Sequence, residues 1–217
     1  MNKVAVILSG CGVFDGAEIH ESVLTLLALS QRGIAYQCFA PDMPQLHVVN
    51  HLTGDVMEAE QRNVLVESAR IARGEVLPVS ALVASDYDAL LVPGGFGAAK
   101  NLSDFALAGA DCQVQAEVLR GCREFAELGK PAGYMCIAPA VAARVYPEGV
   151  RLTIGNDKGT ADAIRAMGAE HVDCDVENVV VDEGHKLVTT PAYMLANNIA
   201  EAAQGISKLV DTLLSFR

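Results

Sequence analysis

The chain has 217 residues, 51% of them hydrophobic and 20% charged, so we expect one domain with a sizeable core and no long disordered segment. Its formal net charge is −11 and its lysines and arginines form no cluster, which argues against nucleic-acid binding. No apolar run approaches the roughly 18 residues that a membrane-spanning helix needs.

Short apolar runs alternate with stretches of helical periodicity along the whole chain. The runs have the length and branching of buried strands, and several of the helical stretches end at a glycine. The pattern predicts strands at residues 4–8, 35–39, 88–92, 131–135, 152–154, 179–181 and 186–190, and helices at about 19–32, 60–73, 98–107, 111–128, 137–144, 161–167 and 199–213.

This alternation predicts a single α/β domain over residues 1–217, with a mostly parallel sheet between layers of helices. The last two strands flank Asp182–His185, which is typical of a hairpin. Residues 41–56 interrupt the alternation as an irregular excursion, and long loops in compact domains are often functional.

The six cysteines favour a reducing compartment. Their even number also suits disulfides, but the chain begins on an apolar strand with no secretory leader. No pair has the C-x-x-C spacing of zinc ribbons or thioredoxin-type sites. We therefore expect a cytoplasmic protein with no bound metal.

Three segments leave strands with unusual composition: residues 10–18, 93–97 and 134–139. In open α/β sheets, ligands bind beyond the carboxyl ends of the strands, so these segments should meet at one rim. The first segment resembles a dinucleotide fingerprint, but Asp15 stands where that fingerprint needs glycine, and a carboxylate repels pyrophosphate. We expect no cofactor here.

Cys136 stands where a strand runs directly into a helix. Such a turn projects its apical residue into the cleft; Ala138 is small enough for it, and Pro139 suits the first helical turn. The adjacent helix N-terminus is expected to lower the pKa of the thiol. The alternative is a buried structural cysteine, and the turn alone weighs the two interpretations evenly.

Gly94 and Gly95 favour the catalytic interpretation. Consecutive glycines allow backbone N–H groups to approach a developing oxyanion, so Gly95 and Ile137 are candidate donors of an oxyanion hole. The alternative is an ordinary tight turn.

These motifs resemble the class I glutamine amidotransferase-like superfamily, in the branch that includes PfpI and the Parkinsonism-associated deglycase. The resemblance rests on Leu91–Gly95, on Cys136 with Ala138 and Pro139, and on Thr189–Ala192. Two further stretches, residues 7–21 and 50–54, are similar to the bacterial ElbB group, which is described as isoprenoid biosynthesis proteins with an amidotransferase-like domain.

The resemblance implies a flavodoxin-like sandwich, a homodimer and glyoxalase III-type lyase activity, in which glyoxal becomes glycolate without glutathione. Some members are described as protein deglycases. The family's nucleophile falls on Cys136 and its thiol-adjacent acid on Glu18. Family members with amidase or peptidase activity carry a histidine partner, but this chain has Ile137 after the cysteine and Gly155 or Asn156 at the later position. Hydrolysis of amides is therefore disfavoured.

The expected reaction adds the Cys136 thiolate to a small 1,2-dicarbonyl, and Glu18 then moves a proton between the two carbons. Cys11, His20 and His51 are further candidates to line the site, each with a purely structural alternative. Two other functions stay open: a thiol redox sensor without catalysis, and a partner subunit that supports isoprenoid metabolism.

Overall fold

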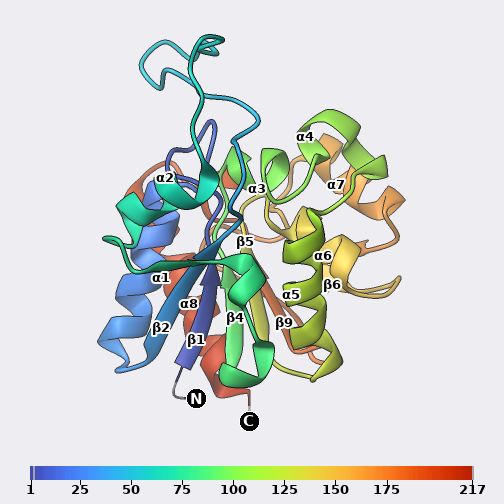
Figure 1. The fold of residues 1–217 in the computed structure, drawn as a ribbon. Coiled ribbons are helices and arrows are strands. Elements are labelled where there is room, and N and C mark those ends of the chain that lie inside the picture. The colour runs from blue at the N-terminus through green and yellow to red at the C-terminus, as the bar shows by residue number, and fades with distance from the viewer. Residues whose placement is uncertain (2, 217) are drawn as a thin grey trace.

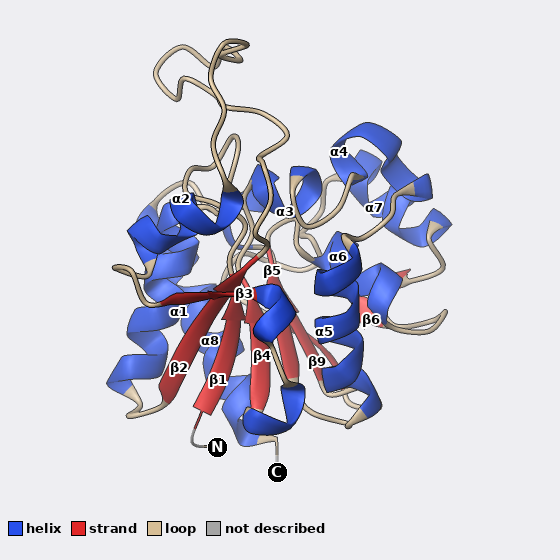
Figure 2. Ribbon diagram, in the orientation of Figure 1, coloured by secondary structure: helices blue, strands red, loops and turns tan. Residues whose placement is uncertain are grey.

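The computed structural model of the protein describes residues 1 and 3–216, and its centre is a seven-stranded sheet in the order β3-β2-β1-β4-β5-β9-β8 (Figures 1 and 2). All neighbouring strands are parallel except β8 and β9. The strands of this sheet are β1 (Lys3–Ile7), β2 (Ala35–Ala40), β3 (Val76–Pro78), β4 (Ala89–Val92), β5 (Ala132–Met135), β8 (Val180–Asp182) and β9 (Leu187–Thr190). A second, two-stranded sheet pairs β6 (Arg151–Leu152) with β7 (Glu170–His171).

Helices cover both faces of the large sheet. Along β1, Val4 and Val6 join one hydrophobic cluster with α1 and α8, whereas Ala5 and Ile7 join the other with α5 and α6. The expected mostly parallel sheet between two helical layers is thus confirmed. The helices are α1 (Ile19–Gln31), α2 (Val64–Ile71), α3 (Phe96–Lys100), α4 (Phe105–Ala108), α5 (Ala116–Glu127), α6 (Pro139–Val145), α7 (Lys158–Ala166) and α8 (Ile199–Ser215).

Some helices and strands differ from those predicted from the sequence. The strand expected at 152–154 ends at Leu152, because the next two amides bond to side chains: Thr153 N–H donates to Thr189 Oγ1 and Ile154 N–H to His171 Nε2. The helix expected at 98–107 is divided into α3 and α4. The edge strand β3 is short, ends in proline and was not predicted.

Residues 41–63 form the excursion between β2 and α2. Bridges pair Pro44 with Asn63 and Val49 with Val56, so the segment doubles back on itself. Figure 1 shows it projecting beyond the carboxyl end of the sheet. Asn63 ends it by capping α2, since its side chain accepts from Val66 N–H.

Within residues 1 and 3–216, no helix combines the length and the apolar character that crossing a bilayer requires.

Candidate active site

Cys136 occupies the sharp turn of residues 136–138 between β5 and α6, which we call the elbow. Its φ is +59°, in the left-handed region that a side chain other than glycine's rarely adopts. Such a conformation costs of order 1–3 kcal/mol, and here the surrounding hydrogen bonds hold it. Cys136 N–H donates to the Thr190 carbonyl at 3.0 Å, and Ala138 N–H donates to the Met135 carbonyl at 3.0 Å.

Gly94 and Gly95 make room for this turn. A Cβ on Gly94 would lie 2.4 Å from the Cys136 Cβ, and one on Gly95 would lie 2.4 Å from the Glu18 nitrogen. Gly95 also has a φ of +90°. Both positions therefore exclude any side chain, which explains the two consecutive glycines.

A cavity of about 220 Å³ opens onto the thiol. It brings together parts of all three segments that the sequence analysis placed at one rim. Cys136 itself is 8% exposed, so only a small molecule inside the cavity can reach the sulfur. The cavity is lined by Val13, Glu18, Gly95, Phe96, Cys136, Ile137, Thr160, Tyr193 and Met194.

The carboxyl group that hydrogen-bonds to the Cys136 thiol belongs to Glu21, which the sequence analysis did not select. Its Oε2 accepts from Gly94 N–H at 2.8 Å, and its Oε1 accepts from Tyr193 N–H at 3.1 Å. The side chain is fully buried, and this burial raises its pKa from 4.5 to about 8. Glu21 is thus poised to exchange a proton near neutral pH.

Glu18, the expected partner of the thiol, caps α1 instead. Its Oε2 accepts from Glu21 N–H at 2.7 Å, so its side chain caps the first turn of the helix. It lines the cavity but leaves the hydrogen bond to the thiol to Glu21. The three-residue spacing places Glu21 one turn further along α1, on the face toward the elbow.

The expected lowering of the Cys136 pKa is wrong. Burial raises the pKa of this thiol well above 9.0, and the charge of Glu21 adds to the effect. The N–H groups of Gly95 and Ile137 lower it, but burial outweighs them. The thiol and the Glu21 carboxyl titrate as a coupled pair, and at neutral pH both groups are predominantly protonated.

The two candidate oxyanion donors do converge on one point. Gly95 N–H and Ile137 N–H both hydrogen-bond to the Cys136 sulfur, one from each strand-to-helix turn. An oxygen on a carbon bonded to that sulfur would lie near both donors.

His20 contacts the cavity wall through Tyr193. Its Nδ1 lies 2.8 Å from the Tyr193 hydroxyl, and their rings are 5.7 Å apart. Burial raises the pKa of Tyr193, and the charges of Glu18 and Glu21 raise it further. The Tyr193 hydroxyl therefore keeps its proton and is a hydrogen-bond donor.

His51 and Cys11 lie outside the lining of this cavity. His51 holds the excursion against the Gly12–Asp15 loop: its Nε2 accepts from Phe14 N–H at 3.1 Å and its Nδ1 lies 3.0 Å from the Val49 carbonyl. The pKa of the half-buried Cys11 thiol is raised, first by burial and then by Glu67. Neither residue therefore lines the Cys136 cavity, contrary to the prediction from the sequence.

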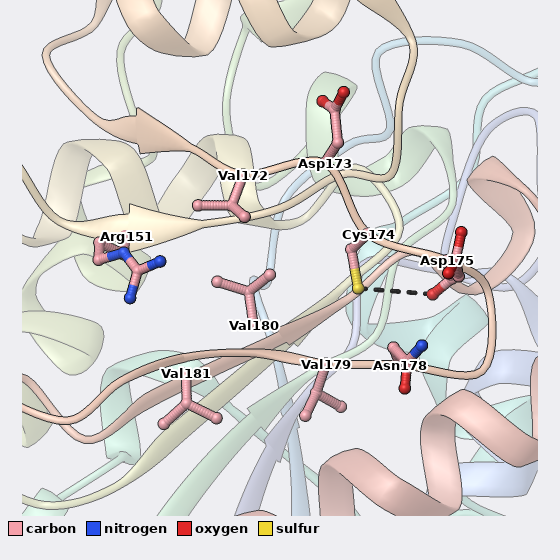
Figure 3. Close-up of a pocket in the computed structure, with 9 residues that line it drawn as sticks. All are labelled: Arg151, Val172, Asp173, Cys174, Asp175, Asn178, Val179, Val180 and Val181. Carbon is pink, nitrogen blue, oxygen red and sulfur yellow. Dashed lines mark hydrogen bonds between the residues drawn. The ribbon is translucent and has the colours of Figure 1, made fainter.

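A separate hollow of about 340 Å³ lies beside the edge strand β8 (Figure 3). It shares no lining residue with the Cys136 cavity. Its cysteine, Cys174, donates to the Asp175 carbonyl at 3.4 Å, and burial raises its pKa to about 11. Cys174 is therefore a useful control thiol.

Across residues 1 and 3–216, no group of three or more His, Cys, Asp or Glu side chains is arranged to hold a metal ion.

Several known proteins are similar to this chain, although no family model matches it. The Homo sapiens "glutamine amidotransferase-like class 1 domain-containing protein 3, mitochondrial" is 48% identical, over 98% of this chain and 82% of that protein. The Danio rerio "ES1 protein, mitochondrial" is 35% identical, over 88% of this chain and 77% of its own length.

Solved structures agree with these relatives. An isoprenoid biosynthesis protein with an amidotransferase-like domain from Ehrlichia chaffeensis superposes with a TM-score of 0.92 at 37% identity, covering 99% of this chain and 98% of that one. Glyoxalase III from Candida albicans superposes with a TM-score of 0.63 at 13% identity, which shows a common flavodoxin-like fold alone. The chain belongs to the class I glutamine amidotransferase-like family that includes the ElbB and ES1 proteins.

Proposed function

We propose that this protein is a cofactor-free glyoxalase, a lyase that converts glyoxal or a similar small 1,2-dicarbonyl into the 2-hydroxy acid. The observation that carries the proposal is the hydrogen bond between the buried Glu21 carboxyl and the thiol of Cys136, a residue that lines a cavity of about 220 Å³. A nucleophile and a proton carrier thus meet where only a small substrate fits.

The first step forms a carbon–sulfur bond. The Cys136 sulfur attacks one carbonyl carbon of glyoxal, and the thiol proton passes to that carbonyl oxygen, which gives a hemithioacetal. Gly95 N–H and Ile137 N–H would stabilise the oxygen while it carries negative charge, as the expected oxyanion hole. Because the resting thiol is protonated, addition depends on this coupled proton movement.

The second step moves a proton between the two carbons. Glu21, in its carboxylate form, removes the hydrogen from the carbon that bears sulfur, and the second carbonyl oxygen gains a proton, which yields an enediol. The proton from Glu21 then goes to the second carbon, and the hydroxyl on the first carbon gives its proton to water, replacing the proton that the second oxygen gained, so that the first carbon becomes a thioester carbonyl. One carbon is oxidised and the other reduced, so no external oxidant is needed. Water cleaves the thioester and restores the thiol.

Glu21 suits this step better than the expected Glu18. A pKa of about 8 leaves a usable fraction of carboxylate at neutral pH while making the acid form an effective donor. The Tyr193 hydroxyl, which lines the cavity and keeps its proton, would serve the second carbonyl oxygen. We assign Glu18 the role of holding α1 in register.

The geometry favours this function over the alternatives. A redox sensor needs an exposed thiolate, whereas Cys136 is 8% exposed with a raised pKa. A protein deglycase must admit a modified side chain on a second protein, and the small cavity favours free aldehydes. The name of the Ehrlichia chaffeensis neighbour suggests a link to isoprenoid biosynthesis, and we propose that link only as the setting in which the enzyme acts.

We propose further that the enzyme acts as a homodimer in the cytoplasm. The six cysteines are all free, which suits a reducing compartment. The similar human and zebrafish proteins are named as mitochondrial, and the mitochondrial matrix is also reducing. Sedimentation at micromolar concentration tests the dimer, and a monomer would contradict it.

Product analysis by proton NMR in D₂O tests the function. The wild-type protein should convert glyoxal to glycolate that carries deuterium at its methylene carbon, provided that the proton held by Glu21 exchanges with solvent. The Cys136→Ser variant should form none, and Cys174→Ser should behave as the wild type. Glyoxal that persists unchanged with the wild-type protein would refute the proposal.

A further inference from the structure

A hollow of about 350 Å³ lies between α5 and the end of α6, and it shares no lining residue with the Cys136 cavity. Two arginines, Arg123 on α5 and Arg144 on α6, line it together with Gln113, Leu119, Glu148 and Met167. Its volume is that of a small-molecule site.

These two arginines are unusual because no carboxylate among residues 1 and 3–216 lies within 4.0 Å of either guanidinium group. The chain has a net charge of −11, and most of its arginines form ion pairs within 4.0 Å. Within the described residues, Arg73, Arg123 and Arg144 form none, and two of these three face one hollow. The paired arginines are Arg32, Arg62, Arg70, Arg120, Arg151 and Arg165.

Backbone contacts hold the two guanidinium groups in place. Arg123 Nη2 donates to the Arg144 carbonyl at 3.4 Å, and Arg144 Nη2 donates to the Ala110 carbonyl. Arg144 also hydrogen-bonds to the Cys112 thiol, while its buried Nε has no partner among the described residues. Since a guanidinium carries five N–H donors, most of their capacity remains unused. An acceptor from outside the chain would satisfy it.

Glu148 is the acidic side chain that lines this hollow, yet it pairs with neither arginine within 4.0 Å. Glu148 is exposed, and the aliphatic part of its side chain packs beside Gly168. It therefore leaves the positive charge uncompensated and would weaken the binding of an anion through repulsion.

We propose that this hollow binds a small phosphorylated molecule through Arg123 and Arg144. Two positive charges match a phosphate dianion, and guanidinium groups form paired hydrogen bonds to phosphate oxygens. Carboxylates share part of this chemistry, so a tricarboxylate serves as the competing probe. Binding at this hollow does not depend on the proposed reaction at Cys136.

Isothermal titration calorimetry at constant ionic strength tests the site, with inorganic phosphate, diphosphate and citrate as probes. Phosphate or diphosphate should bind saturably to the wild-type protein and to Cys136→Ser alike. Arg123→Gln should weaken that binding at least tenfold, and Glu148→Gln should strengthen it. Arg73→Gln is the matched control, because it removes the same charge from an arginine that also lacks an ion pair.

Arg144→Lys keeps the positive charge but loses the planar guanidinium group that forms paired hydrogen bonds to phosphate, so it should weaken phosphate binding. Arg123 is exposed, so its replacement should leave folding intact, and circular dichroism checks both variants. Three results would overturn the inference: no saturable binding of phosphate or diphosphate, equal binding by Arg123→Gln and wild type, or binding of citrate alone.

Discussion

The Glu21 carboxyl group and the Cys136 thiol are hydrogen-bonded to each other in the interior, 0% and 8% exposed. The pair joins the first turn of α1 to the turn after β5, two segments far apart in the chain. Burial raises the pKa of both groups, so the elbow holds its protons at neutral pH until a substrate takes one.

Replacing Glu21 should remove most of the activity. Glu21→Gln abolishes the proton carrier, and we expect kcat/KM for glyoxal to fall about 10²–10⁴-fold, the usual contribution of general acid–base catalysis. Glu18→Gln is the matched control, because glutamine keeps an oxygen that accepts from Glu21 N–H. A larger loss in Glu18→Gln than in Glu21→Gln would return the catalytic role to Glu18.

Glu21 should also make stability depend on pH. Its pKa is about 8 in the folded protein and near 4.5 when unfolded, so between these values the folded state holds the extra proton. The free energy of unfolding should therefore fall as pH rises through this window, by up to about 1.4 kcal/mol per pH unit, and level off above it.

Urea denaturation at several pH values from 5 to 8 measures this slope. Glu21→Gln has one carbonyl oxygen for two N–H donors, Gly94 and Tyr193, so it should be less stable at every pH. Its stability should lack the Glu21 slope, and the difference between variant and wild type should shrink toward pH 8. A constant difference would contradict the raised pKa of Glu21.

Gly94→Ala should disrupt the elbow. The added Cβ would lie 2.4 Å from the Cys136 Cβ and 2.8 Å from Glu21 Oε2, so the turn must shift. We expect a loss of about 1–3 kcal/mol of stability, typical of overpacking, and nearly complete loss of activity. Gly159→Ala is the control, since its nearest neighbour would lie at 3.7 Å. Equal effects of the two substitutions on the urea midpoint would argue against the crowding.

Tyr193→Phe should slow the reaction without unfolding the protein. It removes the hydroxyl that lies 2.8 Å from His20 Nδ1 but keeps the backbone N–H that donates to Glu21. We expect kcat for glyoxal to fall about 10²-fold, the lower end of the range for a lost hydrogen-bond donor to a developing oxyanion. His20→Gln separates the two groups: an unchanged kcat there would show that the hydroxyl acts without the imidazole.

The sheet could be predicted because its central strands are continuous apolar runs, buried on both faces. The Cys136 elbow and the Gly94–Gly95 turn could be predicted too, since each combines a strand end with residues that suit a tight turn. The acid partner could not: Glu18 and Glu21 are both plausible by composition. Only knowing that Glu18 caps α1 shows that Glu21 faces inward. The raised pKa of the thiol also required its burial to be known.

The role of Cys136 as nucleophile can be measured by comparing the rate of glyoxal loss with the wild type, Cys136→Ser and Cys174→Ser. Both variants replace one sulfur with oxygen, but only Cys136 has the Glu21 carboxyl as its partner. We predict that Cys136→Ser loses turnover while Cys174→Ser retains it. Turnover that survives in Cys136→Ser, or that disappears equally in both variants, would contradict the assignment of Cys136 as the nucleophile.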